Sequence, residues 1–139
     1  MKTFILIITA SFLAAAAALA SNYNFISPEK TKTWIETQAP VTIVDIQVKE
    51  EFVSHHLPGS IPTYAYPVKS KLEKSRLDDI VAMSIAKGNP VIVVCPRGGG
   101  GAKRCYDYMK SQSVPEDKLL ILKGGIADWP YKDLLKSGK

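Results

Sequence analysis

Cys95 stands where a cysteine side chain could act as a nucleophile. It ends an apolar run at residues 90–94 and is followed by a proline, an arginine and four consecutive glycines. Glycines let successive backbone N–H groups turn toward one point, and the start of a following helix adds its positive dipole end. Donors placed in this way favour the thiolate over the thiol. The pattern therefore predicts a nucleophilic cysteine in an anion-binding loop.

The candidate binding residues follow this cysteine without a gap. They are Pro96, Arg97, Gly98, Gly99, Gly100, Gly101 and Ala102. Two further cations, Lys103 and Arg104, come just inside the predicted helix and are expected to support binding of an anion. The alternative is a flexible surface loop beside a buried structural thiol. The complete apolar strand directly before the cysteine favours the functional interpretation.

The elements that must position this loop alternate along the chain. Buried strands are predicted at residues 41–46, 90–95 and 119–122, with a further short strand at 65–68. Helices are predicted at residues 28–38, 49–55, 71–86, 102–112 and 131–135. Such alternation indicates an α/β fold, an open parallel sheet flanked by helices, in which ligands bind beyond the carboxyl ends of the strands.

The first twenty residues have the layout of a secretory signal peptide. Lys2 supplies the early positive charge, residues 4–19 are almost wholly apolar, and Ala18-Leu19-Ala20 is a small-x-small cleavage pattern. Cleavage after Ala20 is expected to leave residues 21–139 as one periplasmic or secreted domain, with no stable membrane insertion. An uncleaved membrane anchor is the alternative, since a run of this length could just span a bilayer.

The charge and size of the chain limit the possible partners. The 18 basic and 13 acidic residues give a net charge of +5, and loss of Lys2 leaves 17 − 13 = +4. The basic residues are scattered and do not alternate with aromatic ones, and the protein is predicted to be exported, so nucleic acid is not an expected partner. A chain of this length forms one core, and a monomer is the default expectation.

The cysteine loop resembles the active-site loop of the rhodanese sulfurtransferases. The usual family pattern is Cys-x-x-Gly-x-Arg-Ser/Thr-Ala, which Cys95, Gly98 and Ala102 match without a gap. Two further stretches resemble family segments in the same order and spacing, so the resemblance covers about residues 27–135. The first stretch comprises Val44-Asp45, Glu51-Phe52 and residues 56–61. The second is residues 122–129, which read Leu-Lys-Gly-Gly-Ile-Ala-Asp-Trp.

The resemblance implies a two-step sulfur transfer without a metal or an organic cofactor. Cys95 would take sulfur from a small anionic donor such as thiosulfate or polysulfide and hold it as a persulfide. A thiophilic acceptor, such as cyanide, a dithiol or a thiol or redox protein, would then remove that sulfur. The alternative function is a persulfide carrier that serves a partner redox enzyme with little turnover of its own.

Three positions depart from the family pattern. Gln47 stands where arginine is usual, His55 replaces a glycine, and Gly100 occupies a loop position that is often arginine. Cationic recognition of the donor is therefore expected from Arg97 and the loop backbone. Phosphatases of the same fold carry a Cys-x5-Arg loop, and Gly101 stands at the position of their arginine, so phosphatase or arsenate reductase activity is not expected.

Several other residues have chemistry that the predicted function does not need. Asp45 ends a strand and could either assist catalysis or orient loop backbone by a hydrogen bond. His55 and His56 lack a third ligand at suitable spacing and are expected to be structural. Trp129 is expected in the core or at the mouth of the site. Cys105 is expected in the core, too far along the helix to serve as a resolving thiol.

Overall fold

A single parallel sheet forms the centre of the computed structural model, which describes residues 22–139. The strand order is β1-β5-β4-β2-β3, and every pair is parallel. The strands are β1 (Phe25–Ile26), β2 (Thr42–Asp45), β3 (Ile61–Pro62), β4 (Val91–Val94) and β5 (Leu119–Leu122). The α/β fold predicted from the sequence is therefore confirmed, and β4, the strand before Cys95, is the central one.

The short strand predicted at residues 65–68 is wrong. The edge strand next to β2 is β3, where Ile61 and Pro62 pair with Val44 and Asp45. Residues 65–68 instead form a turn, in which the Val68 N–H donates to the Ala65 carbonyl and Val68 has a φ of +62°. A backbone at positive φ cannot continue a strand ladder.

The helices are α1 (Pro28–Glu36), α2 (Lys49–Ser54), α3 (Lys71–Ser75), α4 (Asp78–Lys87) and α5 (Gly100–Ser111), with 3₁₀ turns η1 (Glu116–Lys118) and η2 (Lys132–Leu134). The single helix predicted at residues 71–86 is two helices. Ser70 caps the first through a reciprocal capping box with Glu73, and the acidic pair Asp78-Asp79 begins the second. The last helix before β5 begins at Gly100, two residues earlier than predicted.

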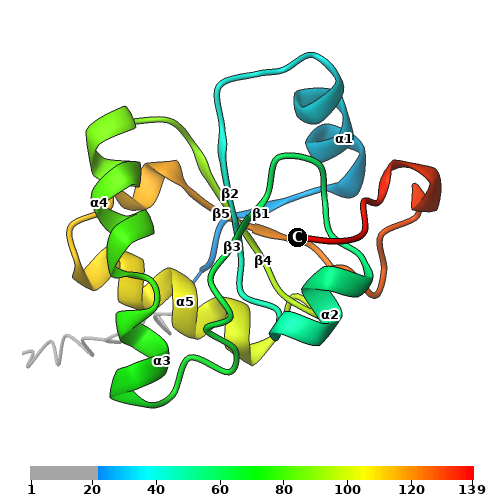
Figure 1. The fold of residues 1–139 in the computed structure, drawn as a ribbon. Coiled ribbons are helices and arrows are strands. Elements are labelled where there is room, and N and C mark those ends of the chain that lie inside the picture. Colours follow the sequence, from blue (N-terminus) through cyan, green and yellow to red (C-terminus); the bar gives the residue numbers. More distant parts are fainter. Residues whose placement is uncertain (1–21) are drawn as a thin grey trace, which may run out of the picture.

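Helices cover both faces of the sheet (Figure 1). On one side lie α3, α4 and α5, and on the other lie α1, α2 and the C-terminal segment. Strand residues alternate between the two: Val91 and Val93 pack in the core cluster that contains α5 side chains, and Ile92 and Val94 pack in the opposite cluster. Cys95 belongs to the α5 side.

The Cys95 loop therefore lies at the carboxyl edge of the central strand, between the sheet and the first turn of α5. Within residues 22–139, no helix is long and apolar enough to cross a membrane. The predicted signal peptide, residues 1–20, lies outside the described residues, and its cleavage stays a prediction.

Candidate active site

The Cys95 sulfur accepts a hydrogen bond from the loop that follows it. The Gly98 N–H donates to Cys95 Sγ across 2.7 Å, and only 2% of Cys95 is exposed. Gly98 has a φ of +67°, a backbone conformation that glycine adopts without steric cost. A short N–H···S contact to a nearly buried sulfur stabilises negative charge on that sulfur.

The first turn of α5 adds further donors at the same place. The helix begins at Gly100, and its N-cap, Gly99, has no side chain with which to cap it. The N–H groups at the start of an α-helix lack partners inside the helix and carry its positive dipole end. Gly99, Gly100 and Gly101 all line the pocket above the thiol, so these groups are available to an anion bound there.

The pocket above the thiol has a volume of about 300 Å³. It is lined by Glu51, Tyr66, Cys95, Pro96, Arg97, Gly99, Gly100 and Gly101. Arg97 is the one cationic side chain in this lining, and Glu51 adds one carboxylate to it. A smaller hollow of about 210 Å³ shares Glu51, Pro96 and Arg97 with the pocket. The site is therefore a thiol in an amide-rich cradle with mixed charge at its mouth.

The turn after β5 holds the loop from below. The N–H of Ile126 donates to the Cys95 carbonyl across 3.0 Å, and the N–H of Ala127 donates to the Pro96 carbonyl across 2.8 Å. A Cβ on Gly125 would lie 2.4 Å from the Cys95 oxygen and 2.6 Å from the Gly98 nitrogen. The two backbone segments therefore touch at a point where only glycine fits.

Residues 27–132 match the sequence profile described as the rhodanese-like domain. The chain belongs to the rhodanese-like domain family. It is also 30% identical over 111 residues to the adenylyltransferase and sulfurtransferase MOCS3 of Drosophila grimshawi. That match covers 76% of this chain but 24% of MOCS3, so the chain spans about a quarter of that relative.

Solved structures share the fold of this rhodanese-like domain. The As-Sb reductase of Leishmania major has a TM-score of 0.64 at 15% identity, over 84% of this chain and 86% of that one. The rhodanese-like domain of Alr3790 from Anabaena has a TM-score of 0.62 at 17% identity, over 84% and 80%. The thiosulfate sulfurtransferase of Pseudomonas aeruginosa has a TM-score of 0.56 at 18% identity, over 84% and 21%.

In this rhodanese-like domain, Asp45 lies behind the site and holds the loop between β2 and α2. Its Oδ1 accepts the Gln47 backbone N–H at 2.8 Å, and its Oδ2 accepts Gln47 Nε2 at 3.0 Å. The same Nε2 donates to the His55 carbonyl at 3.2 Å, so Gln47 joins both ends of α2. Asp45 is fully buried and is absent from the lining of the thiol pocket. Two roles were predicted for Asp45, assistance in catalysis and a hydrogen bond that orients the loop backbone. The structure shows the hydrogen bond to the loop backbone.

Lys103 and Arg104 do not line the thiol pocket. The Lys103 ammonium lies 5.5 Å from the centre of the Tyr23 ring. The Arg104 Nε donates to the Pro67 carbonyl at 2.8 Å, and its Nη1 lies 2.9 Å from where a Cβ on Gly100 would be. Arg104 therefore sits against the outer side of the cradle, because residues 100 and 104 are neighbours one helical turn apart.

Sequence reasoning missed Tyr66 at the pocket. A Cβ on Gly101 would lie 2.8 Å from Tyr66 Cε2, so the tyrosine ring occupies the space that a side chain at position 101 would need. This contact agrees with the absence of the Cys-x5-Arg arginine at that position. No sequence motif marks Tyr66, because its approach depends on the turn at residues 65–68.

Cys105, Trp129 and His56 are held within the fold and do not line the thiol pocket. Burial raises the pKa of the Cys105 thiol, and repulsion from Cys95 raises it further. Cys105 is fully buried in the α5 core cluster, and both cysteines are free. Trp129 is buried and donates its indole N–H to the Tyr131 carbonyl. His56 is stacked on Phe52 and bonded to its carbonyl, and residues 22–139 hold no cluster of three metal-ligating side chains.

Gly125→Ala is predicted to destabilise the fold more than Gly59→Ala does. Both glycines have positive φ, which costs an alanine about 1–2 kcal/mol, but only Gly125 lacks space for a Cβ. Overpacking adds about 1–3 kcal/mol. Urea unfolding of both variants measures the difference, and equal losses of unfolding free energy would contradict the close contact with Cys95 and Gly98.

Asp45 is predicted to make stability depend on pH. Burial raises its pKa from 3.8 to about 6, although the Gln47 hydrogen bonds favour the charged form. The folded protein therefore keeps a proton that the unfolded chain releases, so the free energy of unfolding falls as pH rises from about 4 to about 6. The fall amounts to about 3 kcal/mol and is complete above pH 6.

The variant Asp45→Asn tests this pH dependence by denaturant unfolding at several pH values. Its free energy of unfolding relative to that of the wild type should rise between pH 4 and 6 and stay constant above pH 7. Asp79→Asn, at an exposed position in the first turn of α4, is the control and should not reproduce this trend. A difference between Asp45→Asn and the wild type that is the same at every pH would contradict the effect of burial.

Proposed function

We propose that this rhodanese-like domain is a sulfurtransferase that carries sulfur on Cys95. The observation that supports this most is the 2.7 Å hydrogen bond from the Gly98 N–H to Cys95 Sγ, within a loop of glycines at the start of α5. A nucleophilic thiolate needs this stabilisation, and so does the persulfide anion that forms when a sulfur atom is added to Cys95. The likeness to a protein named as a sulfurtransferase over 111 residues agrees with it.

In the first step, the Cys95 thiolate attacks the outer sulfur of thiosulfate or of a polysulfide. A bond forms between Sγ and that sulfur, and the donor's S–S bond breaks. Its electron pair leaves with sulfite or with the shortened polysulfide. The first-turn N–H groups of α5 and the Arg97 side chain offer the positive field for this anionic donor.

In the second step, a thiophilic acceptor attacks the outer sulfur of the Cys95 persulfide. The bond between the two sulfurs breaks, and the electron pair returns to Cys95 Sγ as the thiolate. Cyanide would yield thiocyanate, and a thiol would yield a new persulfide. Each step moves one sulfane sulfur from one sulfur or carbon nucleophile to another with no net gain or loss of electrons, so the cycle needs no separate oxidant or reductant.

A persulfide carrier is the second candidate function. The pocket lining pairs one guanidinium, from Arg97, with one carboxylate, from Glu51, and position 100 is glycine. This mixed charge gives a small dianion such as thiosulfate weak attraction at the mouth. A domain of this kind would hold sulfur delivered by a partner and turn over slowly with free thiosulfate.

Cys95 is predicted to gain the mass of one sulfur atom when the reduced protein is incubated with thiosulfate or polysulfide. Intact-mass spectrometry measures the gain, and Cys95→Ser should show none. Cys105→Ala is the control and should load as the wild type does, because Cys105 does not line the thiol pocket. Loading of Cys95→Ser with no loading of Cys105→Ala would overturn the assignment of Cys95.

Cyanide separates the two candidate functions. An enzyme forms thiocyanate continuously from thiosulfate and cyanide, whereas a carrier gives one equivalent from the preloaded protein and then stops. Colorimetric detection of thiocyanate over time distinguishes these results. A preloaded protein that releases no thiocyanate at all would contradict both functions.

The domain is also proposed to act outside the cytoplasm. The support is the N-terminal sequence, with Lys2, the apolar residues 4–19 and the Ala18-Leu19-Ala20 pattern. Expression of the full chain in a bacterium should give a periplasmic protein whose intact mass begins at Ser21. Ala18→Gln with Ala20→Gln should block this cleavage, and a wild-type protein that keeps residue 1 would contradict it.

A further inference from the structure

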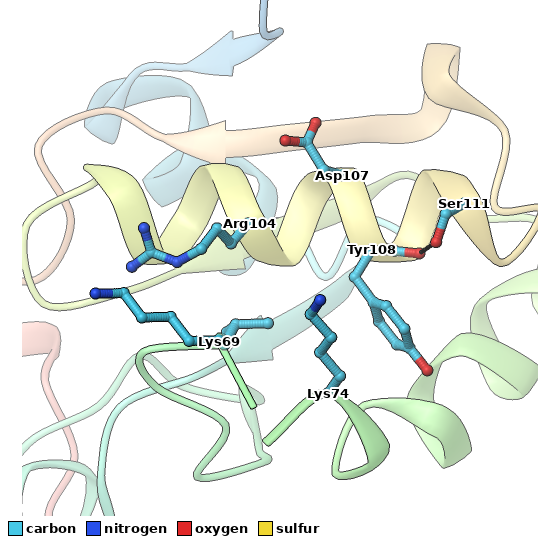
Figure 2. Close-up of a pocket in the computed structure, with 7 residues that line it drawn as sticks. Lys69, Lys74, Arg104, Asp107, Tyr108 and Ser111 are labelled. Atoms are coloured by element: carbon cyan, nitrogen blue, oxygen red, sulfur yellow. Dashed lines mark hydrogen bonds between the residues drawn. The ribbon is translucent and has the colours of Figure 1, made fainter. Parts of the chain in front are cut away.

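A second hollow lies beside the thiol pocket and presents three cations (Figure 2). Its volume is about 370 Å³, and it is lined by Val68, Lys69, Lys74, Arg104, Asp107, Tyr108 and Ser111. Figure 2 shows Lys69 and Lys74 reaching toward α5 from the segment below it, with Arg104 on the facing side of the helix. We call this hollow the cationic pocket.

The three cations of the cationic pocket form no ion pair with a carboxylate of the described chain. Ion pairs of residues 22–139 join Lys32 to Glu36 and Lys110 to Glu116, and none involves the three cations of the pocket. The Asp107 carboxylate accepts the Tyr23 hydroxyl at 2.7 Å and points to the other side of α5 in Figure 2.

Other nearby acceptors are also occupied. Glu73 accepts the backbone N–H groups of Lys69 and Ser70, and Asp78 accepts the Tyr108 hydroxyl. Ser111 donates its hydroxyl to the Tyr108 carbonyl. Hydrogen-bond donors of the two lysines and of the Arg104 guanidinium are therefore left free to a ligand, and a ligand with several negative charges can pair with more than one of them.

The cationic pocket and the thiol pocket share a wall. Arg104 Nη1 lies against Gly100, which lines the thiol pocket. Arg104 Nε is held by the Pro67 carbonyl, and the preceding residue, Tyr66, is 40% exposed and also lines the thiol pocket. A ligand that extends from the first turn of α5 past Arg104 therefore reaches both pockets.

The burial of Cys95 and the charge at its mouth decide which ligand fits. Only 2% of Cys95 is exposed, so an acceptor thiol has to enter past Tyr66 and Arg97. Glu51 stands at this mouth and repels carboxylates that come close to it. The carboxylates of an acidic acceptor are attracted instead to the cationic pocket, one helical turn away.

We propose that the cationic pocket binds an acidic peptide segment of the protein that accepts sulfur from Cys95. The inference rests on the proposed sulfur transfer. Carboxylates of the segment lie against Lys69, Lys74 and Arg104, and its cysteine enters the thiol pocket. Its thiolate attacks the outer sulfur of the Cys95 persulfide, the bond to Sγ breaks, and the electron pair returns to Sγ.

Binding of an acidic peptide is tested first, without sulfur chemistry. The probe is a labelled nine-residue peptide with a central serine and four glutamates, and its twin carries four glutamines. With the Cys95→Ser protein, fluorescence anisotropy should show at least tenfold tighter binding of the glutamate peptide at about 0.01 M ionic strength, and the difference should shrink at about 0.15 M.

The variant K69Q/K74Q should bind the glutamate peptide about tenfold more weakly. The matched control is K87Q/K118Q, which removes the same charge at positions just before β4 and β5, at the opposite end of the sheet from Cys95. Equal binding of the two peptides, or equal binding of the glutamate peptide by K69Q/K74Q and the wild type, would overturn the inference.

Sulfur transfer is tested with the same peptides carrying a central cysteine. Mass spectrometry should show that the persulfidated K69Q/K74Q variant transfers sulfur to the glutamate peptide about tenfold more slowly than the wild type. Its reaction with cyanide should be unchanged, because neither lysine lines the thiol pocket. Equal slowing with both peptides would also overturn the inference.

Failure of the proposed function can be told apart from failure of this inference. A protein that takes up no sulfur from any donor refutes the proposed function. The binding measurements with Cys95→Ser still show whether the cationic pocket binds an acidic peptide.

Discussion

The contact between the loop after β4 and the turn after β5 is the constraint on which the site depends. Two N–H groups from residues 126 and 127 hold the carbonyls of Cys95 and Pro96, while Gly98 and Gly125 approach with no room for a side chain. With these carbonyls bound by the neighbouring turn, the loop places the Gly98 N–H against Cys95 Sγ, and its other glycines line the pocket. Pre-oriented donors of this kind need no rearrangement when charge develops on a ligand.

The parts of the site that the backbone forms, namely the end of the strand, the glycine loop and the following helix, could be predicted from the sequence. The apolar strand and the glycines predict the thiol at the carboxyl end of β4, where it is found, whereas α5 begins at Gly100, two residues before its predicted start. The side-chain orientations of the two cations after the loop could not be predicted, because adjacent residues on a helix point in different directions. Lys103 faces Tyr23 and Arg104 faces Pro67, and neither orientation follows from their spacing after Cys95.

Features that depend on distant parts of the chain could not be predicted. The strand β1 has two residues, too few for a periodic pattern, and exists because Phe25 and Ile26 pair with Ile121 and Leu122. The break between α3 and α4 occurs at Leu77, in the middle of a helical pattern of apolar residues, and the Leu77 side chain is fully buried. The position of Tyr66 over Gly101 is likewise set by a turn that carries no sequence signature.

The four glycines after Cys95 differ in how freely other residues could replace them. A Cβ on Gly98 would meet backbone atoms of the neighbouring turn, and one on Gly101 would meet the Tyr66 ring. Gly99 has a negative φ and open space around it, and a side chain on Gly100 would meet only the movable end of Arg104. Positions 99 and 100 are therefore where a side chain can be added to the lining of the thiol pocket without rebuilding the loop.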